Sequence, residues 1–367
     1  MKSTSREKKP DLILLLVTLL LVTVGTVMIY SSSSILAMER CRDGQFFVKK
    51  QIFFLFLGLL VMVLMTRIPY YKLRKLAWPS IVVSAVLLIA IWIPHLGIRA
   101  GGAVRWLNLG IFSFQVSELA KVALILFLAH FLTQKANHIR EISQGLLIPF
   151  GITGVIVGLI LLQPDFGTTV IISVITLMMI YLAGGRIVHL VGLATLLLPV
   201  AVWLLLHRTY RLTRLMAFMD PWKDPRNSGF QIIQSLIAFG SGGAFGVGIG
   251  DGMQKLFYLP EPHTDFILSV IAEESGFIGV GLILFLYIVL IVRGFQISLK
   301  APELFGNLLA SGLTMLLALE AFINIAGVMG LIPLKGLALP FLSYGGTSLI
   351  MSLIAVGILL NISGYEG

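Results

Sequence analysis

Long apolar runs recur along the whole of this 367-residue chain, and they favour a fold that places most of the chain in a bilayer. A helix needs roughly 20 residues to cross about 30 Å of hydrocarbon, and each run is near that length. Membrane-spanning β-strands would instead show segments of about ten residues with alternating polarity. The sequence therefore predicts an all-α integral membrane protein, a bundle of ten transmembrane helices that forms one polytopic domain over residues 1–367. The predicted spans are 12–35, 47–66, 78–96, 115–133, 145–163, 167–184, 187–207, 265–292, 304–331 and 340–362.

Composition supports this class and excludes others. Hydrophobic residues make up 57% of the chain and charged residues 12%, which leaves too little polar surface for a water-soluble globule. The first apolar run is too long for the apolar part of a secretory signal and lacks a small-residue cleavage site, so we expect it to be retained. Cys41 is the only cysteine and cannot form a disulfide within the chain. The chain shows no basic extramembrane domain and no nucleic-acid-binding motif, so we expect no nucleic acid partner.

The distribution of basic residues predicts the orientation. Ten spans would place both termini on one side, and Lys and Arg divide almost evenly between the two faces. Many of the cations on one face lie in the long segment 208–264, between the seventh and eighth spans, and long loops contribute little to orientation. With that segment set aside, we predict cytoplasmic termini and an extracytoplasmic loop at 208–264. An anionic substrate on the outer face would explain the cations that remain there.

The segment 208–264 is longer than loops usually are without a function. Its first part, RTYRLTRLMAFM, repeats arginine every three residues against an apolar side, which predicts a helix at the membrane interface. Asp220-Pro221 should end that helix, and GFQIIQSLIAF predicts a second short one. The glycines of GVGIGDG resemble a phosphate-binding loop, but the strand, the following helix and the lysine of such loops are missing. A flexible hinge is the interpretation we favour for these glycines.

The stretch YLPEPHTDFILSVIAEESG, residues 258–276, concentrates carboxylates where the eighth span begins. Pro260 and Pro262 should prevent a helix before that point, Thr264 can cap it, and Asp265 would then occupy the first turn. A carboxylate there is favoured by the positive end of the helix dipole. Completing the helix end is therefore the structural alternative to a function for Asp265.

The neighbours of this acid favour a function. Ser269 and Glu273 follow Asp265 by four and eight residues, so all three share a helix face that runs toward the bilayer. Ionisable groups at membrane depth are costly and usually face a cavity, a partner or a substrate. We therefore predict a functional Asp265, while a structural and a functional role stay equally open for Glu273 and Glu274.

Other polar residues are predicted near the same outer face. Glu118 and Lys121 lie three residues apart at the start of the fourth span, so an ion pair is their structural interpretation and substrate binding the functional one. A lone polar residue in a span usually serves packing. So many at one depth predict a shared cavity. The remaining members are Arg105, Gln163, Asp165, Glu320, Asn324, Lys335, Ser343 and Tyr344.

Neither a metal site nor a hydrolase motif is evident. The histidines are scattered without paired ligand spacing. Asp165, Glu261 and Asp265 are the residues we would assign to a divalent cation, Mg²⁺ or Mn²⁺, although no spacing demonstrates such a site. A Ser/His/Asp hydrolase has little support, because no nucleophile elbow is present.

Five ordered stretches resemble the SEDS family of cell-wall proteins (shape, elongation, division and sporulation), over nearly the whole chain. They are RWLNLGIFSFQVSELAK, QPDFGTT, DPWKDPRNSGFQIIQSLIAFGSGG, GVGIGDGMQKLFYLPEPHTDFILSVIAEESG and PLKGLALPFLSYGGTS. Within the family, QKLFYLPEPHTDF and PLKGLALPFLSYGG resemble the division-type branch most, ahead of its sporulation and elongation relatives.

The resemblance implies a glycosyltransferase of the bacterial inner (cytoplasmic) membrane that polymerises lipid II into peptidoglycan strands during cell division. It also implies a class B penicillin-binding protein as the crosslinking partner, alongside other membrane proteins of the division machinery. The essential aspartate of the family matches Asp265 in HTDF, and its conserved lysine matches Lys121 in SELAK. Many relatives have proline where this chain has Val116, but Glu118 and Lys121 are retained, so we expect the same chemistry.

Lipid II carries a disaccharide-pentapeptide on undecaprenyl diphosphate, and its polymerisation inverts the anomeric carbon. One base must take the proton of the acceptor hydroxyl, a contribution of roughly 10²- to 10⁴-fold, and Asp265 is our candidate. The helix end lowers and burial raises the pKa of such a carboxyl, and the sequence does not decide between them. The residues predicted to bind substrate on the extracytoplasmic face are Arg105, Glu118, Lys121, Arg214, Lys255, Glu261, His263, Lys335, Ser343 and Tyr344.

Two other classes of function stay open. A flippase or transporter of lipid II, or of another polyprenyl-diphosphate-linked saccharide, would also have many helices with polar groups at depth, although no inverted repeat is evident. A non-catalytic scaffold that activates a partner enzyme is the third class. In a scaffold, Asp265 would be dispensable for glycan synthesis.

Overall fold

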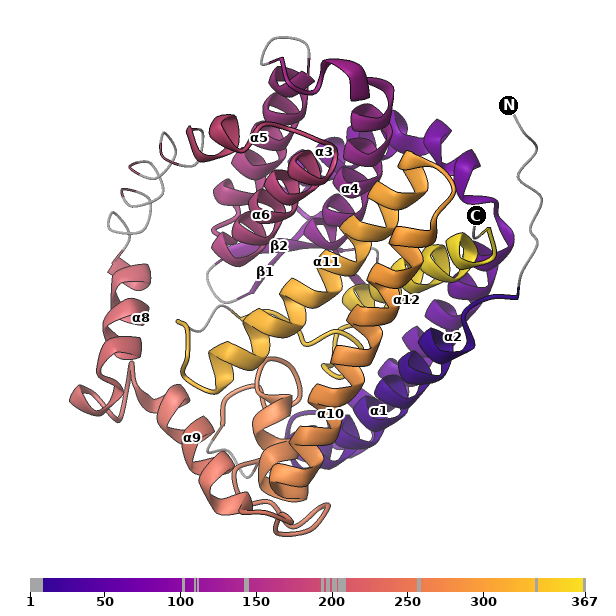
Figure 1. The fold of residues 1–367 in the computed structure, drawn as a ribbon. Helices are drawn as coiled ribbons and strands as arrows, with labels where there is room; N and C mark the ends of the chain where they lie inside the picture. Colours follow the sequence, from indigo (N-terminus) through magenta and orange to yellow (C-terminus); the bar gives the residue numbers. More distant parts are fainter. Residues whose placement is uncertain are drawn as a thin grey trace.

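The computed structural model describes residues 9–100, 103–108, 110, 112–141, 145–192, 195, 199, 203, 209–255, 259–333 and 336–365. Helices dominate it (Figure 1). The first half contains α1 (Leu12–Cys41), α2 (Phe46–Arg67), η1 (Tyr70–Leu76), α3 (Ala77–Ala90), α4 (Val116–Gln134), η2 (Ala136–His138), α5 (Leu147–Leu162) and α6 (Phe166–Leu182). The second half contains α8 (Thr209–Met219), η4 (Pro221–Lys223), α9 (Phe230–Gly242), α10 (Ile267–Lys300), α11 (Leu304–Val328) and α12 (Gly346–Ser363).

These helices make the chain a multi-pass membrane protein. Within the described part of the chain, seven helical segments are long and apolar enough to cross a bilayer, with η1 and α3 counted together as Tyr70–Ala90. The helices α5 and α6 are apolar but shorter, with 16 and 17 residues. The predicted span 187–207 lies largely outside the described residues. The predicted count of ten is therefore not confirmed.

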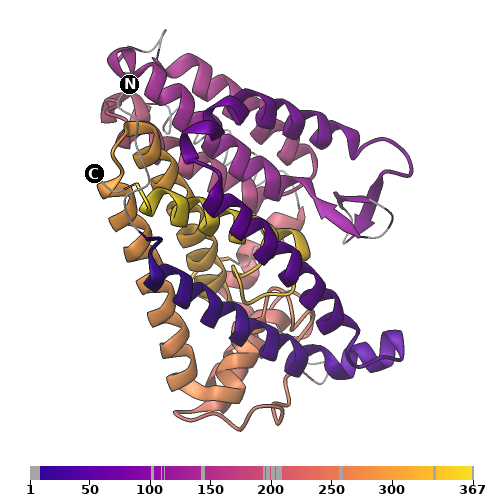
Figure 2. The same cartoon turned by 90° about the vertical axis from the view of Figure 1, so that its right-hand side faces the viewer.

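Three helices form the centre of the bundle. Most side chains of α4, α11 and α12 are buried, whereas α2 and α3 expose long apolar faces, as helices next to lipid do. In Figures 1 and 2, α1 and α2 run along one flank beside α12, and α3 to α6 group on the other side of α11. Near the two ends of the chain, the backbone N–H of Asp11 donates to Ser363 Oγ at 2.9 Å. The start of α1 and the end of α12 therefore lie on the same side of the bundle.

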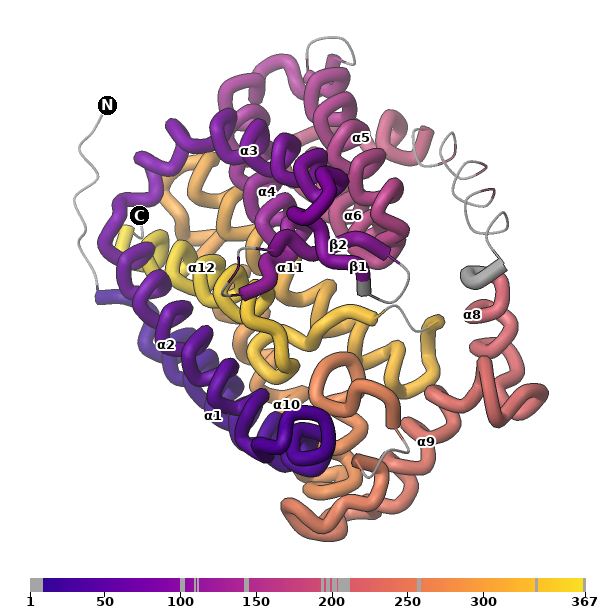
Figure 3. The backbone as a smooth tube through the Cα atoms, turned by 180° about the vertical axis from the view of Figure 1, so that it is seen from behind, coloured from indigo at the N-terminus to yellow at the C-terminus, as the bar shows by residue number. Residues whose placement is uncertain are grey.

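A small sheet corrects the all-α prediction. Strands β1 (Gly97–Ala100), β2 (Ala103–Asn108) and β3 (Ser113–Gln115) pair antiparallel in the order β1-β2-β3, with Trp106 opposite Gln115. Val, Ile, Trp and Phe in this stretch favour extended backbone, and the run is too short and too polar to cross a bilayer. Figure 2 shows the strands projecting from the side of the bundle, and in Figure 3 they lie beside α4. The sheet places the segment before α4 next to α12.

The helix α10 is broken near its start, and the glycine-rich segment fills the break. Gly276 is not helical, with φ 66° and ψ −165°. The backbone N–H groups of Val247 and Gly248 donate to the carbonyls of Glu273 and Glu274, at 3.0 and 3.1 Å. Because these two N–H groups are engaged in the kink, they are not free to bind a phosphate, and this part of GVGIGDG packs against α10. The flexible hinge stays a prediction.

The carboxylates of Glu273 and Glu274 hold the same region. Glu273 accepts hydrogen bonds from the backbone N–H of Met253 at 2.9 Å and of Gln254 at 3.1 Å. Glu274 accepts from Ser31 Oγ and from Lys255 Nζ, both at 2.7 Å. Both carboxylates therefore have the structural role that the sequence left open.

The two helices predicted in the long loop are present. The helix α8 ends at Met219, just before Asp220-Pro221, as predicted, and the short helix η4 begins at Pro221. The helix α9 packs against α10, while α8 lies at the edge of the molecule (Figure 1). The long loop therefore runs beside the bundle and ends in the segment that carries Asp265.

Candidate active site

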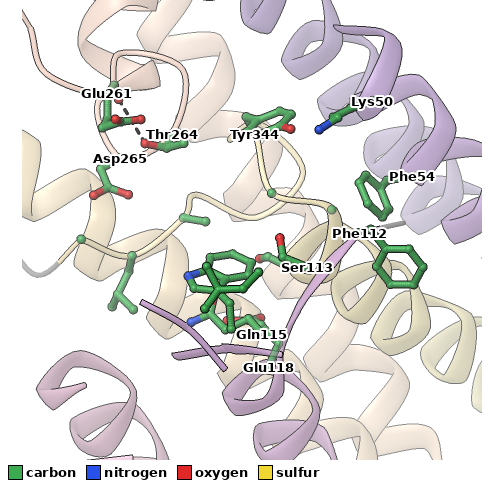
Figure 4. Close-up of a pocket in the computed structure, with 18 of the residues that line it drawn as sticks. Lys50, Phe54, Phe112, Ser113, Gln115, Glu118, Glu261, Thr264, Asp265 and Tyr344 are labelled. Carbon is green, nitrogen blue, oxygen red and sulfur yellow. Dashed lines mark hydrogen bonds between the residues drawn. The ribbon is translucent and has the colours of Figure 1, made fainter. Parts of the chain in front are cut away.

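A cavity of about 820 Å³ opens among α2, the sheet, the start of α4 and the two segments that precede α10 and α12. Figure 4 shows that it brings together residues far apart in the chain. Its lining consists of Lys49, Lys50, Phe53, Phe54, Ile98, Trp106, Phe112, Ser113, Gln115, Glu118, Glu261, Thr264, Asp265, Gly336, Leu337, Ala338, Tyr344, Gly345, Gly346 and Ser348.

The cavity has an apolar side and a polar side. Phe54 and Phe112 meet edge to face, with ring centroids 5.7 Å apart, and lie away from the carboxyl group of Asp265 in Figure 4. Glu261 and Thr264 lie near the acid, and the Thr264 hydroxyl donates to the Glu261 carbonyl at 3.2 Å. Such a lining suits a ligand with one apolar part and one polar part.

Asp265 lies just before α10 and not in its first turn. The N-cap of α10 is Phe266, without a side-chain capping bond, so the predicted cap at Thr264 is wrong. The hydroxyl of Thr264 is engaged with Glu261 instead, and the turn continues to Phe266. The carboxyl of Asp265 is therefore not held as a helix cap, and it lines the cavity.

Hydrogen bonds from other elements fix the backbone at the acid. The carbonyl of His263 accepts from the N–H of Tyr344 at 2.8 Å, and that of Thr264 accepts from Ser343 Oγ at 2.6 Å. The carbonyl of Asp265 accepts from Asn324 Nδ2 at 2.9 Å. Three consecutive carbonyls are thus bound by α11 and the segment before α12, which orients the Asp265 side chain toward the cavity.

Burial raises the pKa of the Asp265 carboxyl to about 6. Three nearby charges contribute less than burial to this value. Arg214 lowers the pKa, Glu261 raises it and Arg105 lowers it, in decreasing order of effect. Gly336 faces this carboxyl with φ +63°, and a Cβ there would lie 3.1 Å from Asp265 Oδ2. The acid therefore has a pKa above the ordinary value for aspartate and lies beside open space, an arrangement that would suit a general base.

His263 and Tyr344 form an aromatic group next to Asp265. The rings of both contact Phe47, with centroids 4.6 and 5.3 Å away. Burial, with a smaller contribution from the charge of Arg40, lowers the pKa of His263 to about 4, so the imidazole is neutral at pH 7. His263 therefore supports the wall of the cavity without adding a charge, whereas Tyr344 lines it.

Glu118, Lys121 and Glu320 form a buried ionic triad. Lys121 Nζ lies 2.7 Å from Glu118 Oε1, and it also binds a carboxylate oxygen of Glu320, from α11. The Lys121 side chain is only 2% exposed, and of the three only Glu118 lines the cavity. The ion pair that the sequence left open is present, with a second carboxylate.

Several residues predicted to bind substrate lie outside the lining. Arg105 donates to the carbonyls of Gln163 and Pro164, at 3.1 and 2.7 Å. Lys255 is buried and pairs with Glu274 at 2.7 Å, which directs its charge into the fold. Arg214 lines a second, smaller cavity. Lys335 lies outside the described residues.

The proposed set of metal ligands is not assembled. Asp165 caps α6, since its carboxylate accepts from the N–H and the hydroxyl of Thr168 at 3.1 and 2.8 Å. Among the described residues, no group of three or more His, Cys, Asp or Glu could hold a metal ion. Only Glu261 and Asp265 of the set line the cavity.

Two lining cations, Lys49 and Lys50, were missed in the sequence. Lys50 lines the cavity with its ammonium 4.3 Å from the centroid of the Phe46 ring, while its neighbour Lys49 pairs with Asp43 at 2.8 Å. Both lie in the first turns of α2, inside the predicted span 47–66, where lysines at a helix end are typical of an ordinary membrane flank. The signal was the excess of cations on one face, which indicated an anionic substrate without naming the residue.

Together, these features define a polytopic membrane protein that holds a carboxyl with a raised pKa beside a large cavity, part aromatic and part polar. A family model matches residues 11–367 of the chain, and the chain belongs to that family, the FtsW, RodA and SpoVE cell cycle proteins. This agrees with the resemblance to the SEDS family seen in the sequence.

Individual relatives cover almost the whole chain. A probable peptidoglycan glycosyltransferase FtsW from Trichlorobacter lovleyi is 47% identical over 96% of this chain and 93% of its own length. Stage V sporulation protein E from Bacillus subtilis is 44% identical over 99% of both chains.

Solved structures agree with the fold. A chain from a peptidoglycan synthase complex, described as coordinating polymerization and crosslinking, superposes with a TM-score of 0.79 at 33% identity, over 96% of this chain and 97% of that one. The rod shape determining protein RodA of Thermus thermophilus superposes with a TM-score of 0.70 at 30% identity, over 96% of each chain.

Proposed function

We propose that this chain is a peptidoglycan glycosyltransferase that polymerises lipid II into glycan strands during cell division, with Asp265 as the general base. The family supports the reaction class, since relatives at 44–47% identity are named probable peptidoglycan glycosyltransferases. The observation that carries the role of Asp265 is its placement: a carboxyl with a pKa raised to about 6 lines a cavity of about 820 Å³.

The lining suits an amphipathic substrate. Phe53, Phe54 and Phe112 offer an apolar wall for the first part of a polyprenyl chain, and Lys50 offers a cation for a diphosphate. The polar side, with Ser113, Gln115 and Glu118, offers hydrogen-bond partners for sugar hydroxyls. These groups would hold the anomeric carbon of one substrate near Asp265. No covalent bond between enzyme and substrate is needed.

The reaction is a single displacement. The 4-hydroxyl oxygen of the acceptor sugar attacks the anomeric carbon of the donor, and the bond between that carbon and the diphosphate oxygen breaks. The proton of the hydroxyl passes to the Asp265 carboxylate, and the negative charge that develops on the leaving diphosphate lies near Lys50. One base and one displacement give the inverted product.

We place the protein in the bacterial inner membrane, with both termini cytoplasmic and the cavity on the extracytoplasmic face. The meeting of Asp11 and Ser363 supports termini on one side, and the cations near the cavity suit an anionic substrate handled outside the cell. A class B penicillin-binding protein is the proposed partner, alongside other division proteins, because the superposing synthase chain comes from a complex that joins polymerization to crosslinking.

Polymerisation of purified lipid II by the Asp265→Asn variant tests the function. The parent protein, alone or with its transpeptidase, should form glycan polymer, and the variant should bind lipid II but form none. Asp251→Asn, which removes an exposed carboxylate from the long loop, is the matched control and should stay active. Polymer formed by Asp265→Asn at the parent rate would refute the role of the acid.

The same preparation separates the rival functions. In vesicles, a flippase would move labelled lipid II between leaflets without forming polymer. A scaffold would leave polymerisation by a partner unchanged in Asp265→Asn. Repeating the assay with EDTA tests whether the reaction needs Mg²⁺ or Mn²⁺, which Glu261 and Asp265 would hold.

A further inference from the structure

One face of the small sheet forms a wall of the cavity that Asp265 lines. Ile98 on β1 lies opposite Trp106 on β2, and Trp106 lies opposite Gln115 on β3. Residues directly opposite each other on neighbouring strands have their side chains on the same face of a sheet. All three residues line the cavity, so this row across the sheet is presented to a bound molecule.

The other face of the sheet packs on the protein. Leu107 and Phe114, each one position along its strand from this row, lie opposite each other and pack in the hydrophobic core. Arg105 precedes Trp106 and, because side chains alternate along a strand, shares the face of Leu107. Its guanidinium binds two carbonyls at the corner between α5 and α6, at 3.1 and 2.7 Å. The strand that presents Trp106 is therefore fixed from the side away from the cavity.

Gln115 is held in one orientation beside Trp106. Its backbone N–H donates to Thr347 Oγ1 at 3.2 Å, and its Nε2 donates to Ser117 Oγ at 3.1 Å. These two bonds join the end of β3 to α12 and to the first turn of α4. They engage the amide nitrogen and leave Gln115 Oε1 as the acceptor available to a ligand in the cavity.

An aromatic ring beside an amide acceptor suits a pyranose ring that carries an acetamido group. A pyranose has a face of C–H groups, which packs on an aromatic ring, and an edge of polar groups, which needs hydrogen bonds. Trp106 offers the aromatic ring, and Gln115 Oε1 offers an acceptor for the N–H of the acetamido group. A polyprenyl chain has no group that would use this acceptor.

We propose that Trp106 and Gln115 bind the N-acetylated sugar ring attached to the diphosphate, and that they determine the preference of this chain for N-acetylhexosamine substrates. The inference rests on the proposed function, because it concerns the saccharide of the same substrate. The ring next to the diphosphate is assigned to this row because Lys50, the cation proposed for the diphosphate, lines the same cavity. Trp106 and Gln115 would thus position the anomeric carbon and take no part in the proton transfer.

Binding measurements separate the sugar from the lipid. The full-length Asp265→Asn protein in detergent, which should not turn over, is titrated with lipid II and with undecaprenyl diphosphate, which lacks the sugars. Adding Trp106→Ala should weaken lipid II binding about tenfold and leave undecaprenyl diphosphate binding unchanged. Trp106→Phe should retain most of the affinity, because it keeps an aromatic face. Trp92→Ala, which removes an exposed tryptophan outside the lining, is the control and should change neither affinity.

A second probe tests Gln115 while the tryptophan stays in place. The probe is a lipid II analogue with hydrogen in place of the acetamido group on the ring next to the diphosphate. The Asp265→Asn protein should bind this analogue about tenfold more weakly than lipid II, because the analogue leaves the Oε1 acceptor unpaired. With Gln115→Leu added, which keeps a side chain of similar size without the acceptor, the two ligands should bind with equal affinity.

Three results would overturn the inference. Equal weakening of lipid II and undecaprenyl diphosphate by Trp106→Ala would show that the ring contacts the polyprenyl chain, and unchanged binding of both would remove it from the site. A preference for the acetamido group that survives Gln115→Leu would be the third. If Trp106→Ala does not fold, the Gln115 comparison decides. Failure of the proposed function is a separate result, since it would appear as absent polymer from the parent protein whatever these affinities are.

Discussion

Asn324 donates from Nδ2 to the carbonyl of Asp265 at 2.9 Å and to the carbonyl of Leu337 at 2.6 Å. One amide on α11 therefore joins the two segments that line the cavity, the one with the acid and the one with Gly336. The amide is buried, so neither carbonyl can exchange this partner for water without a cost. The position of the Asp265 carboxyl thus depends on a residue that lies outside the lining.

We expect Asn324→Ala to lower kcat about 10²-fold with little change in KM. Without the amide, the Asp265 backbone can shift, and a misplacement near 1 Å costs about that much in an oriented reaction. Asn361→Ala is the matched control, since Asn361 Nδ2 donates to the Thr66 carbonyl at 2.8 Å, away from the cavity. It should lower the melting temperature and spare kcat. Equal losses of kcat in the two variants would contradict a positioning role.

The pH profile should report the Asp265 carboxyl. Burial raises its pKa to about 6, so a base there is protonated and inactive in acid. We expect kcat/KM to be flat above pH 7 and to fall about tenfold per unit below pH 6. An acid limb near pH 4, the ordinary value for aspartate, would show that burial does not govern this group.

Neighbouring charges should move that limb in opposite directions. Glu261 raises the pKa of Asp265, so Glu261→Gln should shift the limb to lower pH. Arg105 lowers it, so Arg105→Gln should shift the limb to higher pH. Shifts of the same sign in both variants would point to a general change of the fold and not to charge.

Lys50 should contribute to substrate binding. Its ammonium belongs to the cavity lining, so Lys50→Gln should raise the KM for lipid II about tenfold, the value of a charge-assisted hydrogen bond. Added salt should weaken the parent more than the variant. Lys72→Gln, which removes an exposed lysine of η1, is the control. A KM unchanged from the parent would remove Lys50 from the substrate site.

Helix positions follow from the sequence where an apolar run has polar ends. The prediction 115–133 differs by one residue at each end from α4, Val116–Gln134. The last helix was predicted from residue 340 but begins at Gly346. Pro340 lacks a backbone N–H, Phe341 adopts φ 67°, and the next residues bind the segment of Asp265. The apolar residues from 340 onward indicated a helix, but contacts with the distant segment of Asp265 prevent one before Gly346.

The candidate site was predictable in part. Charge at membrane depth is costly, and this cost identified Asp265 and Glu118, both of which line the cavity. Lys255 and Arg105 are cations of the same kind, but their partners come from α10 and from the Gln163-Pro164 corner. Sequence spacing does not encode such partners, so it could not separate cations that line the cavity from those that hold the fold.

The glycine-rich segment gives a stability prediction. Gly246 has φ +81°, and a Cβ there would lie 2.2 Å from the Glu274 carbonyl oxygen, inside the break of α10. We expect Gly246→Ala to destabilise the protein by at least about 1–3 kcal/mol, the cost of a strained backbone alone. Gly240→Ala is the control, because a Cβ there meets nothing within 4 Å. Thermal unfolding in detergent compares them, and equal melting temperatures would contradict the packed arrangement.

The buried triad gives the last prediction. Lys121→Met would leave Glu118 and Glu320 as two buried carboxylates without their cation, which should cost about 3–5 kcal/mol of stability. Neutralising both acids as well, in Lys121→Met with Glu118→Gln and Glu320→Gln, should restore the melting temperature, because no buried charge then lacks a partner.

Activity should not return with stability in that triple variant. The carboxylate of Glu118 lines the cavity beside Gln115, and Lys121 holds it there, so the neutral set lacks the charged wall that the substrate meets. Lipid II polymerisation and thermal unfolding, measured on the same preparations, separate the two roles. A stable triple variant that polymerises at the parent rate would assign the triad to folding alone, and an unaffected melting temperature in Lys121→Met would contradict the buried ion pairs themselves.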